Sequence, residues 1–147
     1  MSVADKHGNY IGGVILPGLR VSLNSLSGKT AQLPYISLEV PDKVIGKNTI
    51  DCMRAGIIFS NVDMIDGLLD RMEKELGEAP TVIATGGLAR FITPLCRHTI
   101  IYDDALLLKG LLILYRKNNT VRNRAAVFCK SAKADGCFIC YLPLLCL

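Results

Sequence analysis

Several features that would settle a broad functional class are missing from this sequence. No uncharged apolar run approaches the roughly 18–20 residues that a membrane helix needs, and the apolar stretch 106–115 is short and interrupted by Lys109. The first seven residues are polar and lack the apolar region of a secretory signal peptide. Basic residues form no stripe of the kind that binds nucleic acid. We therefore expect a cytoplasmic protein with no membrane or nucleic-acid partner.

Metal-ligand patterns are also scarce. The two histidines, His7 and His98, are far apart, with no carboxylate or cysteine at ligand spacing, and we expect both at the surface. Of six cysteines, Cys52 and Cys96 read as small buried hydrophobes. The other four lie in the last 19 residues, at positions 129, 137, 140 and 146. They contain one closely spaced pair where a zinc ribbon needs two, so an appended tail without metal is the preferred interpretation and zinc the alternative.

The chain is long enough for one domain, with 147 residues, of which 50% are hydrophobic and 20% charged, and a net charge of +4. Its periodicities alternate between strand and helix, which predicts an α/β fold with a partly parallel sheet. We expect strands over 9–16, 35–40, 81–84 and 99–102, and helices over 19–33, 51–59, 64–76, 88–96 and 105–117. A boundary is predicted after residue 118, with 119–147 as a cysteine-rich tail.

The stretch 81–90 is the most informative: an apolar run ends in Thr85-Gly86-Gly87, and a helix pattern follows. Glycine at such a joint lets a flat ligand lie against the backbone, and a helix start offers N–H groups to an anion or a polar edge. Turn geometry alone is the alternative explanation of these glycines.

Three further segments accompany this joint. They read Gly-Asn-Tyr-Ile-Gly-Gly-Val-Ile-Leu-Pro-Gly-Leu at 8–19, Thr-Ala-Gln-Leu-Pro at 30–34 and Ile-Gly-Lys-Asn-Thr at 45–49. In this order and spacing, the four segments resemble the C-terminal half of a type III pantothenate kinase. The resemblance implies an actin/Hsp70/sugar-kinase (ribonuclease H-like) ATPase fold, here a mixed sheet with flanking helices. It also implies transfer of the ATP γ-phosphate to pantothenate, the first step toward coenzyme A.

The family's other motifs have no counterpart here. Members carry an Asp-x-Gly-Asn-Thr phosphate loop, a catalytic aspartate and an Asp-x-Gly-Thr-Ala-Thr-Thr loop, and none of these occurs in the sequence. The sequence therefore reads as half an enzyme that lacks its catalytic base, and we expect this chain to be inactive alone. ATP, Mg²⁺ and a monovalent cation, K⁺ or NH₄⁺, are the cofactors that the resemblance implies, and the cation ligand is missing.

By the same resemblance, Thr49, Gly12 and Gly13 bind substrate, and Thr85, Gly86 and Gly87 form the adenosine end of the ATP site. Thr49 would reach pantothenate in the neighbouring subunit of a homodimer. The alternatives are a helix cap for Thr49 and turn geometry for the glycines. The Asp103–Asp104 pair could bind a cation, but a helix cap at Asp104 is the preferred interpretation. A non-catalytic dimerising remnant and a transcription accessory factor are the alternative functions.

Overall fold

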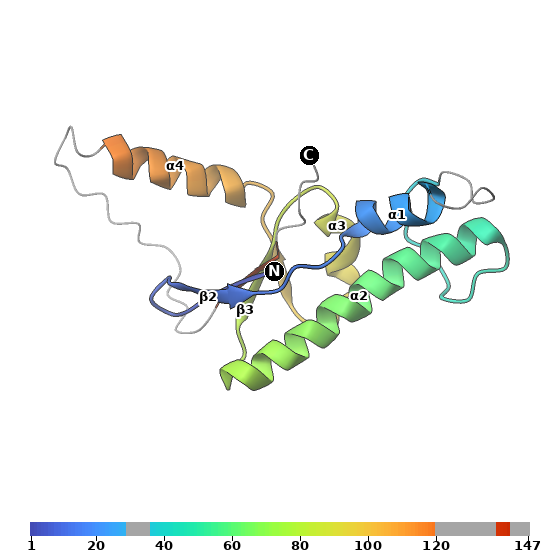
Figure 1. Cartoon of the computed structure of the whole chain (residues 1–147), viewed down its shortest axis with the longest axis horizontal. Helices are drawn as coiled ribbons and strands as arrows, with labels where there is room; N and C mark the ends of the chain where they lie inside the picture. Colours follow the sequence, from blue (N-terminus) through green and yellow to red (C-terminus); the bar gives the residue numbers. More distant parts are fainter. Residues whose placement is uncertain (29–35, 120–137, 142–147) are drawn as a thin grey trace.

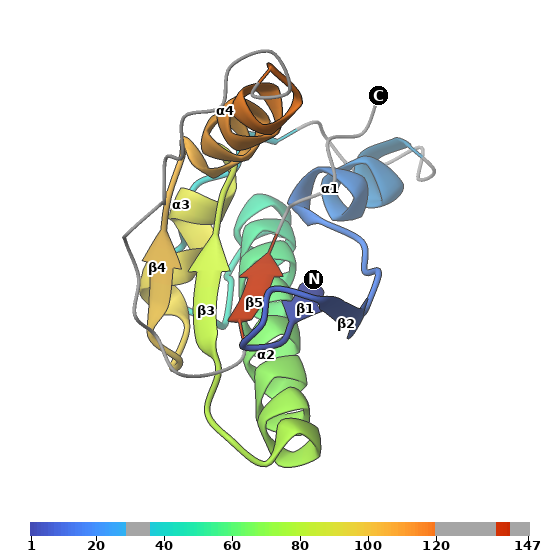
Figure 2. The ribbon, with the colours of Figure 1, turned by 90° about the vertical axis from the view of Figure 1, so that its left-hand side faces the viewer.

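The computed structural model describes residues 1–28, 36–119 and 138–141, the last as backbone only. The described residues form a mixed sheet of five strands in the order β2-β1-β5-β3-β4 (Figure 2). Strands β3, β4 and β5 are parallel, whereas β1 runs antiparallel to both of its neighbours, β2 and β5. The expected α/β class with a partly parallel sheet is therefore confirmed. The strands are β1 (Ser2–Ala4), β2 (Tyr10–Gly13), β3 (Thr81–Ala84), β4 (Ile100–Tyr102) and β5 (Phe138–Tyr141).

A single long helix, α2 (Thr49–Leu76), forms the centre of the core. The sequence predicts two helices here, and that division is wrong. Ser60 and Asn61 lie at the expected break, but both side chains donate to the carbonyl of Ile57, at 3.3 Å and 2.8 Å, so the helix accommodates these polar residues. Its buried side chains recur every three to four residues and continue across the break, which gives both halves one apolar face. They include Met53, Ile57, Ile58, Val62, Ile65 and Leu69.

Both ends of α2 follow the expected capping rules. The Asn48 side chain accepts a hydrogen bond from the amide of Asp51 at 2.9 Å, so Asn48 is the N-cap. Gly77 ends the helix with φ of 74°, a left-handed conformation in which glycine avoids the penalty of a Cβ atom.

Helix α1 (Leu19–Gly28) packs on α2. Helix α3 (Ala89–Ile92) contacts α2 and lies beside it on the same side of the sheet (Figures 1 and 2). Helix α3 is shorter than the predicted helix 88–96 because a 3₁₀ turn, η1 (Thr93–Leu95), follows it. Pro94 lies in this turn and has no N–H to continue an α-helical ladder. The predicted part of α1 beyond residue 28 falls outside the described residues.

Two short segments differ from the predicted strands. Residues 36–40 form no strand; Arg54 of α2 instead donates to the carbonyl and hydroxyl oxygens of Ser37, at 3.1 Å and 2.8 Å. Strand β1 was not predicted, because its three residues are too few to show an alternating pattern.

Strand β5 occupies the middle of the sheet, although it comes from the stretch that the sequence presents as an appended tail. It pairs with β1 on one side and β3 on the other. Strand β5 ends at Tyr141, two residues before Pro143, so the proline does not lie within the strand. The boundary after residue 118 stays a prediction, which truncation can test.

The last helix, α4 (Leu106–Asn119), agrees with the predicted 105–117 within two residues. Figure 1 shows α4 on the opposite side of the sheet from α2. None of its residues is buried, and its apolar side chains stay largely exposed, as for Leu108 at 67% and Leu111 at 53%. Within the described part of the chain, no helix has the length and apolar character to cross a membrane.

Candidate nucleotide and substrate site

The turn after β3 has the conformation that its glycines require. Gly86 has φ of 95°, a left-handed conformation that side chains rarely adopt. Its carbonyl oxygen accepts hydrogen bonds from the amide of Ala89 at 3.0 Å and from the hydroxyl of Tyr102 at 3.3 Å. Turn geometry thus explains Gly86 fully.

Gly87 is different, because its backbone conformation does not demand glycine. A Cβ atom added there would meet nothing within 4 Å. The preceding Thr85 is only 4% exposed, so the turn is anchored on one side and open on the other. An open glycine on an anchored turn is a surface against which a flat ring can lie.

The helix after this turn contributes less than its sequence predicts. Helix α3 has four residues, and its N-cap, Leu88, makes no side-chain capping hydrogen bond. A macrodipole develops over several turns of helix, so α3 offers little of the anion attraction expected from a longer helix. The turn is better suited to a neutral base or ribose than to a phosphate.

The pair Gly12-Gly13 ends β2, next to the start of the chain. The amide of Val14 donates to the carbonyl of Met1 at 2.9 Å, and the Met1 amino group donates to the carbonyl of Val14 at 2.7 Å. A Cβ atom on Gly13 would collide with the Met1 carbonyl oxygen. The close approach of these two backbones accounts for Gly13 without a ligand.

A pocket of about 300 Å³ opens beside Gly12 and Gly13, between β2 and the second half of α2. Its lining is mainly apolar, with Arg71 and Glu75 as the charged members. The other lining residues are Val3, Ile11, Val14, Leu68, Met72 and Leu76.

Both glycine pairs lie toward the same edge of the sheet. Strand β2 is antiparallel to β1, which is antiparallel to β5, so β2 runs in the same direction as β3. Gly13 and Thr85 therefore both lie at the carboxyl ends of strands, the edge where open α/β sheets bind ligands. Strands β1 and β5 separate them, which amounts to about 14 Å at the usual strand spacing.

Thr49 is not part of this edge. It is the first residue of α2, it is exposed, and Asn48 rather than Thr49 provides the cap. Helical rise places Thr49 about 35 Å from Met72, which lines the pocket beside Gly12. The structure therefore does not bring the three predicted substrate residues together within one chain.

A second pocket, of about 410 Å³, lies next to the start of α2. Charged side chains of both signs line it, among them Lys43, Lys47, Asp51 and Arg54. Arg54 is committed to an ion pair with Glu39, at 3.2 Å. Two of its lining residues, Lys47 and Asp51, lie two positions before and after Thr49 in the sequence.

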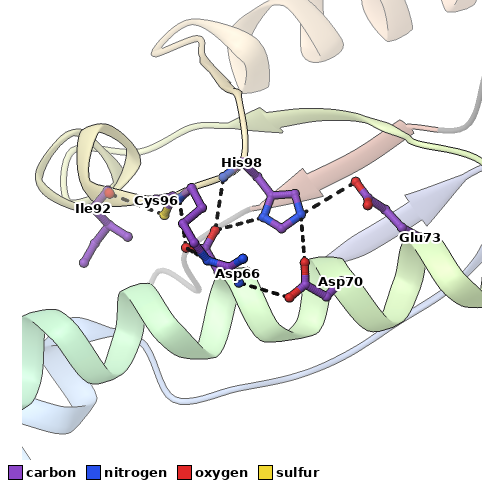
Figure 3. Close-up of polar contacts among 7 residues, drawn as sticks. Asp66, Asp70, Glu73, Ile92, Cys96 and His98 are labelled. Atoms are coloured by element: carbon purple, nitrogen blue, oxygen red, sulfur yellow. Dashed lines mark hydrogen bonds and ion pairs between the residues drawn. The ribbon is translucent and has the colours of Figure 1, made fainter.

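A polar network that no local sequence pattern predicts joins α2 to the segment before β4 (Figure 3). Asp66 has a side chain only 3% exposed, and it accepts the backbone amides of Arg97 at 2.9 Å and His98 at 3.3 Å. His98 Nδ1 lies 2.9 Å from Asp66 Oδ1, and Arg97 contacts Asp70 at 3.0 Å. His98 was expected at the surface, but its side chain is 15% exposed and held by this network.

Opposing influences set the proton affinity of Asp66. Burial raises the pKa of its carboxyl. The pKa is lowered by hydrogen bonds from the Arg97 amide, the His98 ring and the His98 amide, and by the charge of Arg97. The lowering effects dominate, so the pKa of Asp66 lies below its usual value. A depressed pKa in the folded state means that this contribution to stability is present above pH ~4 and is lost as pH falls through the folded pKa.

The other residues that the sequence singles out, Asp103 and the cysteines of the domain body, have no ligand-binding arrangement in the described part of the chain. At the start of α4, the side chain of Asp103, not the expected Asp104, accepts a hydrogen bond from the Ala105 amide at 3.0 Å. A hydrogen bond from Lys109 lowers the pKa of the Asp103 carboxyl. Cys52 is exposed rather than buried, while burial and the Asp66 charge raise the pKa of the half-buried Cys96 thiol to about 11.

No group of side chains suited to a metal ion occurs among the described residues. The four-cysteine alternative cannot be placed there, because 129, 137 and 146 lie outside those residues and only the backbone of Cys140 is described.

Comparisons with known proteins identify relatives. The sequence profile of a family described as type III pantothenate kinase matches residues 1–71. A type III pantothenate kinase of Bacillus cytotoxicus is 44% identical over 114 residues, which are 78% of this chain and 43% of that protein. One from Syntrophus aciditrophicus is 40% identical over 112 residues, or 76% of this chain and 44% of that protein. The chain thus spans less than half the length of these curated relatives.

A solved structure also matches the fold. It is described as a Baf family transcriptional activator from Campylobacter jejuni, with a TM-score of 0.54 and 21% sequence identity. The match covers 80% of this chain and 54% of that one. At this identity the likeness concerns the fold alone.

Proposed function

This chain is homologous to part of the type III pantothenate kinases, and we propose that it serves the reaction of that family. The reaction is the ATP-dependent phosphorylation of pantothenate to 4′-phosphopantothenate, the first step of coenzyme A biosynthesis. Identity of 44% over 78% of the chain supports the assignment. We assign the adenosine surface to Thr85, Gly86 and Gly87, and part of the pantothenate contact to Thr49, Gly12 and Gly13. In this proposal the chain is part of a ribonuclease H-like ATPase fold and acts in the cytoplasm.

The observation that carries this proposal is the open backbone at Gly87. Its turn lies at the carboxyl end of β3, is anchored by the nearly buried Thr85, and leaves the space over Gly87 empty. Gly86 holds the turn in shape through its own conformation and its bond to Tyr102. The base or ribose of ATP would lie against Gly87, with specificity from the neighbouring backbone groups.

Metal ions belong to the family's chemistry, where Mg²⁺ neutralises phosphate charge and a monovalent cation, K⁺ or NH₄⁺, assists. The described residues offer no cluster suited to a metal. We assign no catalytic base to these residues, because the catalytic aspartate of the family has no counterpart in this sequence.

A homodimer is the arrangement that suits Thr49. Its distance of about 35 Å from the pocket beside Gly12 rules out a shared site within one chain, and a second subunit could bring the two together. The exposed apolar surface of α4, including Leu108 and Leu111, supports self-association, since surfaces of this kind are usually covered by another chain.

Replacing Gly87 with valine tests the nucleotide site. We expect Gly87→Val to keep its thermal unfolding temperature, because the added side chain meets open space, and to lose at least about tenfold in adenosine affinity through steric exclusion. Titration calorimetry of both proteins with adenosine measures the change.

Gly56→Val is the matched control, since Gly56 is also open to solvent but lies on α2, away from the turn. It should bind adenosine as the original chain does. Equal affinities for the original chain and Gly87→Val, with both folded, would reject the assigned site.

A further inference from the structure

We propose that His98 is held as an imidazolium between carboxylates of α2, and that it forms a proton-dependent clasp between α2 and the segment leading into β4. Both ring nitrogens face acid oxygens (Figure 3). Nδ1 lies 2.9 Å from Asp66 Oδ1, while Nε2 lies 3.2 Å from Asp70 Oδ1 and 3.7 Å from Glu73 Oε1. The inference does not depend on the proposed kinase function.

The positions of the protons follow from what each group can donate. An ionised carboxylate only accepts hydrogen bonds, and a neutral imidazole carries one N–H. A neutral His98 would therefore set a lone pair of one ring nitrogen against an acid oxygen. The imidazolium donates from both nitrogens, so it is the form that satisfies the Asp66 and Asp70 contacts together.

The surrounding charges favour the same form. Three acids of α2 face the ring, and Arg97 forms ion pairs with two of them, Asp66 and Asp70. Lys74 lies near Asp70 and Glu73 on the outer side of α2. Arg97 also feels the charge of Asp63 on α2, and its side chain is 69% exposed. The Cys96 thiol adds no charge at neutral pH, because burial keeps its pKa at about 11. A protonated ring thus reduces an excess of negative charge in a half-buried site.

The clasp fixes more than one side chain. Asp66 also binds the backbone amides of Arg97 and His98, so the chain between η1 and β4 is attached to α2. The segment from Thr85 to His98 is then held at one end by the sheet and at the other by α2. Loss of the ring proton would release the contacts of Nε2 with Asp70 and Glu73 and leave the Nδ1 contact with Asp66.

His98→Gln is the decisive variant, with His7→Gln as its matched control. His7 lies in an exposed turn, and its backbone amide rather than its ring binds Asp5. As pH rises from about 5 to about 8, the range in which histidines titrate, the folding equilibrium constant of the original chain should fall about tenfold more than that of His98→Gln. That difference corresponds to one charge-assisted hydrogen bond. His7→Gln should behave as the original chain, and Asp70→Asn should lose part of the pH dependence.

Urea unfolding at each pH measures these constants, and ¹⁵N spectra of histidine-labelled original chain report the ring directly. We expect both ring nitrogens of His98 to carry protons at neutral pH, where an unpaired imidazole is mostly neutral. A neutral ring with a single N–H there would overturn the proposal, as would equal pH dependence in the original chain and His98→Gln. If His98→Gln does not fold, the ring spectrum of the original chain decides the question.

Discussion

A protein made only of these 147 residues is expected to form no phosphopantothenate above the uncatalysed background. Phosphoryl transfer depends on positioned phosphates, neutralised charge and a group that orients the attacking hydroxyl. The motifs that provide these in the family have no counterpart in the sequence. Loss of one electrostatic donor costs an enzyme about 10²–10³ in rate, and several are missing together.

Transfer of labelled phosphate from ATP to pantothenate, with Mg²⁺ and K⁺ present, measures this activity. The relative from Bacillus cytotoxicus, similar to this chain over 43% of its own length, is the natural positive control. Product formation by the 147-residue chain, surviving repurification and absent from a Gly87→Val preparation, would contradict the expectation.

Removal of residues 119–147 is expected to destabilise the fold strongly. The deletion takes away β5, which pairs with both β1 and β3 in the middle of the sheet. Without it, the β1–β2 hairpin has no ladder to β3 and β4. Loss of several ladder hydrogen bonds, at about 1 kcal/mol each, predicts a decrease on the order of 4 kcal/mol in the free energy of unfolding, a large part of a typical domain's total.

Urea unfolding under reducing conditions compares the full chain with residues 1–118. A variant lacking only 142–147 keeps β5 and removes one cysteine of the tail, Cys146, so it separates loss of the strand from loss of the chain end. An unchanged unfolding midpoint for 1–118 would contradict the central position of β5 and confirm the boundary that the sequence predicts.

Elements with a local signal were predictable from the sequence. Strand β3 is followed by the glycines that mark its turn, and α4 carries helix-forming apolar residues on both sides of Lys109. Asn48 and Gly77 mark the ends of α2. The middle of α2 was misread, because Ser60 and Asn61 resemble a break until their bonds to Ile57 are known. The place of β5 was not predictable, since its partner strands lie more than 50 residues away along the chain.

The candidate site also contains features with a local sequence signal and features without one. Thr85-Gly86-Gly87 is a local pattern, and its geometry could be anticipated from the residues themselves. The contact of Asp66 with His98 joins residues 32 positions apart, so no local pattern reveals it. One signal was available: Asp66, Asp70 and Glu73 recur at helical spacing and so share one face of α2. That acidic stripe next to buried apolar positions called for a positively charged partner.

We propose that this chain carries the adenosine surface of a pantothenate kinase but not the phosphate-binding loops. Comparison of adenosine with ATP by titration calorimetry, at an ionic strength of about 0.15 M to screen surface charge, tests this proposal. We expect weak binding of both ligands, with affinities equal within about twofold, because only the adenosine part finds a site. Absence of binding by either ligand, or ATP binding more than about tenfold tighter than adenosine, would contradict it.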